Sequence, residues 1–286
     1  MRSEEKNKIV GGMLYLVSTP IGNLSDMSER ALKVLSEVDF IAAEDTRNTL
    51  RMLTHFGISR PLVSYFEHNK AERGEQIAAR LEAGEACALV TDAGTPAISD
   101  PGEDLVRLCA ERGIPVTAIP GACAGICALT LSALSTVRFC FEGFLPVKKA
   151  DRRKRLDALA KEERTMLLHE APHKLRDTLD DLMKTLGNDR RISLCRELTK
   201  LNEEVMRVTL SEAVAYYKEH EPRGEYVLVI EGSDVGGAVP DTPNMTVEEQ
   251  VELYVRDGMS KMDAIKKVAK ERGVPKNDVY KLFNRD

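Results

Sequence analysis

The sequence predicts an α/β protein with two α/β domains and a small C-terminal module of three helices. Three observations indicate this fold class. Short runs that are apolar throughout alternate with helical patterns, which is typical of parallel sheets covered on both faces. The length of 286 residues suits two domains with an appendage. The end of the chain, by contrast, carries only helical periods and capping residues.

The first domain is predicted over residues 13–119. Five strand-like runs lie within it, at 14–18, 39–43, 62–66, 86–90 and 113–119. Asp26, with Glu29 three residues on, is predicted to cap the first helix, and further helices are predicted at 76–82 and 103–112. Because the strands are apolar on both faces, they are expected to form a parallel sheet between layers of helices.

The second domain is predicted over residues 120–232. Its strand-like runs lie at 137–141, 165–169, 192–195 and 226–230. An amphipathic helix is predicted at 174–186, and the segment 203–220 connects the last two strands. Residues 233–244 are rich in Gly, Pro and Asp, so they are predicted to be a linker.

A helix-turn-helix-like module is predicted over residues 245–286. Thr246 can cap its first helix, with Glu249 completing a capping box. Ser260 can cap the second helix, and Asn277 can open the third. Nine basic and eight acidic residues give the module a net charge of +1. This is too little charge for a module that reads a DNA groove by itself.

Composition and charge exclude several classes of protein. A net charge of −5 excludes a general coat of positive charge, so nucleic-acid binding would need a local patch. Six cysteines without a C-x-x-C pair favour reduced thiols, and no metal is expected. Residues 1–12 are charged and lack an apolar segment, so they are predicted to be a disordered tail. Since no apolar stretch is long enough to span a bilayer, we expect a cytoplasmic protein without membrane partners.

Three loops rich in glycine, proline and small residues follow predicted strands of the first domain, at 19–23, 91–102 and 120–124. Ligands of open parallel sheets bind beyond the carboxyl ends of the strands. A connection as long as 91–102 is unusual unless it has a function. None of the three matches the glycine patterns of dinucleotide or triphosphate sites. The loops therefore predict a compact organic ligand without phosphates, held largely by backbone contacts.

Four ordered motifs carry a family resemblance: LVSTPIGNL at 16–24, AEDTR at 43–47, DAGTPAISDPG at 92–102 and IPGACA at 119–124. Together they resemble the tetrapyrrole methylase superfamily, and the resemblance extends from residue 13 to residue 286. It implies two α/β domains with S-adenosyl-L-methionine in the cleft between them, usually in a homodimer. Within the superfamily, the chain resembles enzymes that methylate the ribose 2′-hydroxyl of a cytidine in the decoding region of 16S rRNA.

The resemblance also implies which residues contact the cofactor. Matching the family's loops position by position gives Pro20, Asp92, Ala93, Gly94, Thr95, Ile98, Cys123 and Ala124. Looser matches in the second domain fall at Glu170 with Ala171 beside it, and at Leu198. Thr95 stands where the porphyrin enzymes carry an acidic residue, which argues against a corrinoid or sirohaem substrate.

Methyl transfer to a hydroxyl needs alignment and a group that takes up the proton. Two polar clusters follow the second and third predicted strands, at the ligand-binding edge of the sheet. We expect His68 or Glu67 to be the base, with Asp45 as a further candidate and Arg47 on a phosphate. The alternative is that Asp45 and Arg47 form a structural ion pair and that His68 only makes hydrogen bonds within its loop.

Binding RNA phosphates requires positive charge, and a basic stretch follows the first strand of the second domain. Between residues 148 and 155 the net charge is +5. The predicted RNA-binding residues are Lys148, Lys149, Arg152, Arg153, Lys154 and Arg155. The alternative is that this stretch is a solvated helix face.

Two other functions are compatible with the sequence. One is a methylase of a tetrapyrrole or another small molecule on the same fold, although a porphyrin requires neither the basic stretch nor the helical module. The other is a DNA-binding regulator with a ligand-sensing body, which the weak charge of the helical module disfavours. We therefore expect 16S rRNA or the assembled small ribosomal subunit as the partner, and no DNA.

Overall fold

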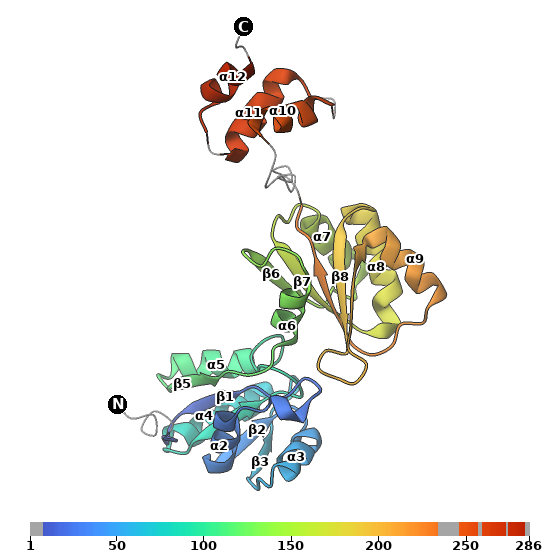
Figure 1. The fold of residues 1–286 in the computed structure, drawn as a ribbon. Helices are drawn as coiled ribbons and strands as arrows, with labels where there is room; N and C mark the ends of the chain where they lie inside the picture. The colour runs from blue at the N-terminus through green and yellow to red at the C-terminus, as the bar shows by residue number, and fades with distance from the viewer. Residues whose placement is uncertain (1–7, 234–245, 257–258, 273, 284–286) are drawn as a thin grey trace. The chain divides into compact units, whose positions relative to one another are not determined.

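The structure is a computed structural model, which describes residues 8–233, 246–256, 259–272 and 274–283. The chain separates into two compact units, Met1–Ser233 and Asp234–Asp286. The first holds two five-stranded sheets with their helices, and the described part of the second is helical (Figure 1). Residues 1–7 of the predicted tail, and nearly all of the linker predicted at 233–244, lie outside the described residues.

The first sheet is parallel throughout, in the order β3-β2-β4-β1-β5. Its strands are β1 Leu14–Val17, β2 Phe40–Ala43, β3 Leu62–Ser64, β4 Cys87–Val90 and β5 Val116–Ile119. Its helices are α2 Glu29–Glu37, α3 Thr46–His55, α4 Lys70–Glu82 and α5 Gly102–Glu111. Within β4, Ala88 and Val90 share a buried cluster with α2 and α3, whereas Cys87 and Leu89 share one with α4 and α5. Both faces are buried, so the predicted parallel sheet between helices is confirmed.

Three local predictions for this domain need correction. Ser28 rather than Asp26 caps α2, because its side chain accepts a backbone N–H of the first turn at 3.2 Å. Asp26 instead ends a short 3-10 turn, η1 Leu24–Asp26. Helix α4 begins earlier than predicted, at Lys70, since its first turn is mostly polar and shows no apolar period. Helix α3 is absent from the predicted helices, because it buries only Thr49 and Leu53.

The second sheet has the order β6-β7-β10-β8-β9, with β6 and β7 parallel and the other pairs antiparallel. Its strands are β6 Phe139–Gly143, β7 Thr165–Glu170, β8 Arg191–Arg196, β9 Glu204–Thr209 and β10 Tyr226–Ile230. Its helices are α6 Ala124–Leu131, α7 Lys149–Leu159, α8 Pro172–Leu186 and α9 Leu210–Glu219. Helices α7, α8 and α9 pack on one face and α6 on the other. The edge strand β9 is missing from the predicted strands, because none of its residues is buried.

In the described part of the helical unit, α10 spans Val247–Arg256, α11 Lys261–Arg272 and α12 Lys276–Phe283. The predicted capping box is confirmed, since Thr246 Oγ1 accepts the N–H of Glu249 at 3.2 Å and Glu249 Oε2 accepts that of Thr246 at 2.7 Å. Ser260 caps α11 as predicted. The prediction that Asn277 opens the third helix is wrong, because α12 already begins at Lys276. Of the helices described, none is both long and apolar enough to cross a membrane.

Candidate functional site

The three loops that follow β1, β4 and β5 are joined to one another at the carboxyl edge of the first sheet. Thr19 and Gly94 exchange two backbone hydrogen bonds, at 2.9 and 3.1 Å. The hydroxyl of Thr95 donates to the carbonyl oxygen of Ala122 at 3.0 Å. Since its one proton is used there, it accepts from Ser18 Oγ, also at 3.0 Å. The prediction that these loops meet at one sheet edge is therefore confirmed.

The close approach of the loops restricts which residues can occupy them. A Cβ added to Gly121 would lie 2.7 Å from Ser18 Cβ, so this position has no room for a side chain. In the loop after β4, Ala97 and Ser99 adopt positive φ angles of 67° and 64°. The Asp100 carboxylate holds that loop in place by accepting the N–H of Ala97 at 3.0 Å. Backbone strain of this kind persists where the surrounding structure imposes it, and it clusters at functional sites.

A cavity of 470 Å³ lies between these loops and the second sheet, within the size range of sites for small organic ligands. Four of the predicted cofactor residues line it, namely Ala93, Ala124, Glu170 and Leu198. The other predicted positions share the same loops, namely Pro20, Asp92, Gly94, Thr95, Ile98 and Cys123. Among these, the side chain of Ile98 is 45% exposed. Part of the predicted cofactor set thus lines one cavity with walls from both α/β domains, and the rest lies on the loops of one wall.

Sequence reasoning misses most of the wall that the second domain contributes. These additional lining residues come from four separate segments, namely Phe144, His169, Pro172, His173, Cys195, Glu197, Lys200, Glu225, Tyr226 and Val227, whereas Ala171, which also lines the cavity, lies at a predicted position. The one local signal is the run HEAPH at 169–173, which places a histidine and a carboxylate at the end of strand β7 and a second histidine three residues beyond it. Only the sheet order brings the other segments to it.

The loop after β8 is held in a strained conformation beside the cavity. Glu197 and Thr199 have positive φ angles of 51° and 67°. Lys200 Nζ donates to Glu197 Oε1 and to Glu225 Oε2, each at 2.9 Å, and the bond from Lys200 lowers the pKa of Glu197. Between two lining residues, the Thr199 hydroxyl is buried without a hydrogen-bond partner among the described residues. A buried polar group in that state is suited to a ligand that supplies the missing bond.

His169 brings a neutral imidazole to the cavity. Burial lowers the pKa of His169 below its ordinary value of 6.5. The ring centroid lies 5.5 Å from that of Phe141 and 5.6 Å from that of Phe144, which also lines the cavity. A neutral imidazole beside a ligand cavity can accept a proton near neutral pH.

The predicted catalytic clusters lie at the same sheet edge but outside the cavity lining as the described residues define it. Asp45 caps α3, and its carboxylate pairs with the exposed guanidinium of Arg47 at 3.2 Å, which lowers the pKa of Asp45. Glu67 pairs with Lys70 at 2.7 Å, and the ring of His68 lies against Phe66. The backbone N–H of Asp45 donates to Asp92 Oδ1 at 3.3 Å. The cluster around Asp45 is thus hydrogen-bonded to the loop 91–102, which contributes Ala93 to the cavity lining.

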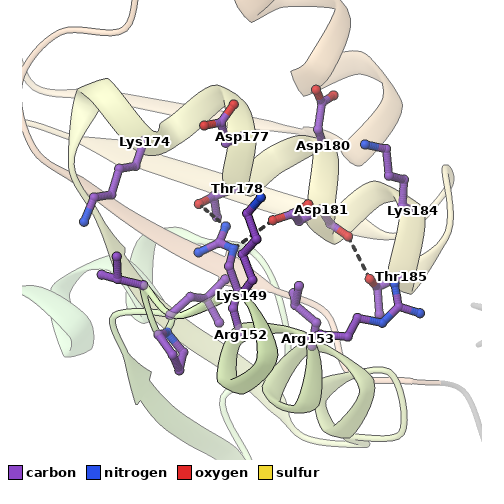
Figure 2. A pocket seen from close by; sticks show the side chains of 14 residues that line it. Lys149, Arg152, Arg153, Lys174, Asp177, Thr178, Asp180, Asp181, Lys184 and Thr185 are labelled. Atoms are coloured by element: carbon purple, nitrogen blue, oxygen red, sulfur yellow. Dashed lines mark hydrogen bonds and ion pairs between the residues drawn. The ribbon is translucent and has the colours of Figure 1, made fainter.

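The predicted RNA-binding stretch forms the start of α7. Its arginines are engaged within the chain: Arg152 pairs with Asp181 at 2.8 Å, Arg153 pairs with Asp157 at 3.0 Å, and Arg155 pairs with Glu142. A groove of 550 Å³ runs between α7 and α8, and both acidic and basic side chains line it (Figure 2). The net positive charge of the stretch is therefore partly offset by neighbouring carboxylates.

Comparison with known proteins defines the class. The family model for tetrapyrrole (corrin/porphyrin) methylases matches residues 13–214. The chain belongs to this methylase family. Solved structures of a uroporphyrin III C-methyltransferase from Thermus thermophilus and of a diphthine synthase share the fold, with TM-scores of 0.55 and 0.59 at 17% and 16% identity. They cover 77% of this chain each, and 97% and 90% of their own chains. The predicted fold class is confirmed.

Two curated relatives place the chain more narrowly. It is 48% identical over 275 residues to a protein from Synechocystis sp., covering 95% of this chain and 97% of that one. It is 45% identical over 276 residues to a protein from Bacillus subtilis, covering 96% and 94%. Both relatives are named ribosomal RNA small subunit methyltransferase I. Within the methylase family, the chain belongs with these proteins.

Proposed function

We propose that this protein transfers a methyl group from S-adenosyl-L-methionine to the ribose 2′-hydroxyl of a cytidine in the decoding region of 16S rRNA. The names of its relatives support methylation of small-subunit ribosomal RNA. A neighbour of the same fold is titled as a complex with S-adenosylhomocysteine, which supports S-adenosylmethionine as the methyl donor. The single observation in the chain itself that carries the proposal is the cavity between the three joined loops and the second sheet.

The residues of this cavity suit a sulfonium nucleoside. Ile21, Leu198 and Val227 offer apolar surface to a base and to a methyl group. The lining also carries carboxylates, at Glu197 and Glu225, which can accept hydrogen bonds from hydroxyl or ammonium groups. When bound, the donor supplies an electrophilic methyl group, so the chain needs to align the substrate and take up one proton.

We assign proton uptake to His169, because burial keeps this imidazole neutral at the cavity. His68, Glu67, Asp45 and Arg47 are proposed to meet the RNA beside the cavity, since they share the sheet edge but not the cavity lining.

The start of α7 is proposed to bind RNA phosphates mainly through its lysines. Lys148, Lys149 and Lys154 extend from the helix whose arginines already have carboxylate partners. We also propose that the protein acts in the cytoplasm as a homodimer, which sedimentation equilibrium at micromolar concentration would test.

The decisive experiment measures methyl incorporation from labelled S-adenosylmethionine into small ribosomal subunits, free 16S rRNA and uroporphyrinogen. We expect incorporation into RNA and none into the porphyrin. A 2′-O-methyl group removes the nucleophile of alkaline cleavage, so the modified cytidine should resist alkali at one phosphodiester. Alkali-labile product would reject the ribose assignment, and methylated porphyrin would support the small-molecule alternative.

A further inference from the structure

A chain of polar groups connects the groove between α7 and α8 to the candidate cofactor cavity. Arg152 Nε donates to Asp181 Oδ2 at 2.8 Å, and Arg152 Nη2 donates to Thr178 Oγ1 at 2.9 Å. Thr178 Oγ1 in turn donates to Glu170 Oε2 at 2.5 Å. Figure 2 shows Arg152 reaching from α7 to Thr178 and Asp181 on α8. Glu170 is the member of this chain that lines the cavity.

Thr178 and Glu170 are buried, so the loss of either of their hydrogen bonds would be costly in free energy. Thr178 is 0% exposed and Glu170 is 4% exposed, so neither can replace a lost partner with bulk water. A hydroxyl has one proton and two lone pairs. Because Thr178 gives its proton to Glu170, its hydroxyl can only accept from Arg152. Every hydrogen bond of the series is therefore donated in the direction from Arg152 toward Glu170. Glu170 Oε1 accepts the N–H of Ala171 at 2.8 Å, which fixes the other end of the carboxylate.

We propose that Arg152 and Thr178 are positioning residues that fix Glu170, and with it the end of β7, in the wall of the cavity for the methyl donor. The affinity for that donor then depends on an arginine of α7 outside the cavity lining defined by the described residues. The proposal rests on the proposed function. It also reassigns Arg152, whose side chain is only 17% exposed, from the RNA-binding set to the support of the cofactor site.

The test compares Thr178→Val, which removes the hydroxyl at nearly constant shape, with Thr178→Ser, which keeps it. Binding of S-adenosylhomocysteine is measured by titration calorimetry. Valine removes the hydrogen bonds to the buried Glu170 Oε2 and to Arg152 Nη2, so we expect affinity to fall about tenfold, whereas serine should stay within about twofold of wild type. Thr185→Val is the matched control, because Thr185 lies on α8 in the same groove but donates to the backbone oxygen of Asp181.

Arg152→Gln keeps the proposal testable if the valine variant does not fold. We expect weaker binding of S-adenosylhomocysteine and an unchanged salt dependence of RNA binding. Wild-type affinity for S-adenosylhomocysteine in both Thr178→Val and Arg152→Gln would overturn the proposal. It would also fail if Arg152→Gln lowered only the salt dependence, since Arg152 would then contact RNA. If the wild-type protein bound no S-adenosylhomocysteine, the proposed function itself would fail instead.

Discussion

Replacing Gly121 with alanine would place a methyl group 2.7 Å from Ser18 Cβ. Ser18 cannot swing away, because the clash involves its Cβ rather than the free end of a side chain. Ser18 is also buried, and its hydroxyl is hydrogen-bonded to that of Thr95. The two backbones would therefore have to separate by about 0.7 Å to reach the shortest ordinary contact of 3.4 Å.

The magnitude follows from that displacement. Forcing a methyl group into a tightly packed position costs about 1–3 kcal/mol. For a protein unit of this size, each kcal/mol lowers the Tm by about 2–4 °C. The Ser18–Thr95–Ala122 bonds tie the three loops together, so the shift spreads to the walls of the cavity. A misplacement approaching 1 Å is enough to reduce function by up to about 100-fold, and we expect affinity for S-adenosylhomocysteine to fall at least about tenfold.

The assay pairs thermal unfolding with calorimetric titration of S-adenosylhomocysteine, and Gly57→Ala is the control. Gly57 has a φ of +67° with no atom near its absent Cβ, so alanine there costs about 1–2 kcal/mol of backbone strain away from the cavity. Both variants should lose stability, but only Gly121→Ala should lose affinity. Equal affinity in the two variants would refute the reasoning that the joined loops shape the site.

Three further predictions concern RNA, catalysis and pH. Replacing three lysines of the basic stretch together with glutamine should make the salt dependence of RNA binding weaker. The negative slope of the logarithm of the association constant against the logarithm of the salt concentration should become shallower by about 2, as measured by fluorescence anisotropy on an rRNA fragment. These lysines are Lys148, Lys149 and Lys154. An unchanged slope would remove them from the RNA surface. Single alanine substitutions at the two polar clusters should lower turnover on small subunits without changing affinity for S-adenosylhomocysteine. The substituted residues are Asp45, Glu67 and His68. Wild-type turnover in all three would eliminate both clusters from the mechanism. Since burial lowers the pKa of His169 below 6.5, the unfolded chain binds more protons than the folded one in that range. Stability from this group is therefore present above pH 6.5 and lost as the pH falls through the folded-state pKa. Between about pH 7.5 and about pH 5.5, urea unfolding should show a larger loss for wild type than for His169→Gln, and parallel profiles would contradict this.

The strands of the first domain and the loops after them are predicted well from the sequence, because each is marked by residues that are neighbours in the chain. A fully buried strand such as β4 is apolar at every position, and the loop after it is marked by Gly94 and Pro96. Where burial is partial, the signals fade. Helix α3 buries two residues, and the edge strand β9 buries none, so neither carries the continuous apolar run of a buried element.

The polar clusters after β2 and β3 show where sequence reasoning about the site stops. The sequence predicts that these polar side chains lie at the carboxyl edge of the sheet, because they follow strands. It does not predict how far each side chain lies from the cavity. Asp45 is committed to capping α3 and to Arg47, while His169 reaches the cavity from the second sheet. A strand end marks a polar residue as a candidate, and only the packing of the two domains selects among the candidates.

The amino-acid sequence by itself determined the parallel sheet, its three loops and the methylase family, because these depend on residues close together in the chain. Tertiary structure alone decided that His169, Glu197 and Glu225 share one cavity, and that Arg152 faces Thr178 rather than solvent. The physical reason is that each of these contacts joins separate strands and helices. Their positions follow from the buried cores that order the sheets, and no local pattern carries that information.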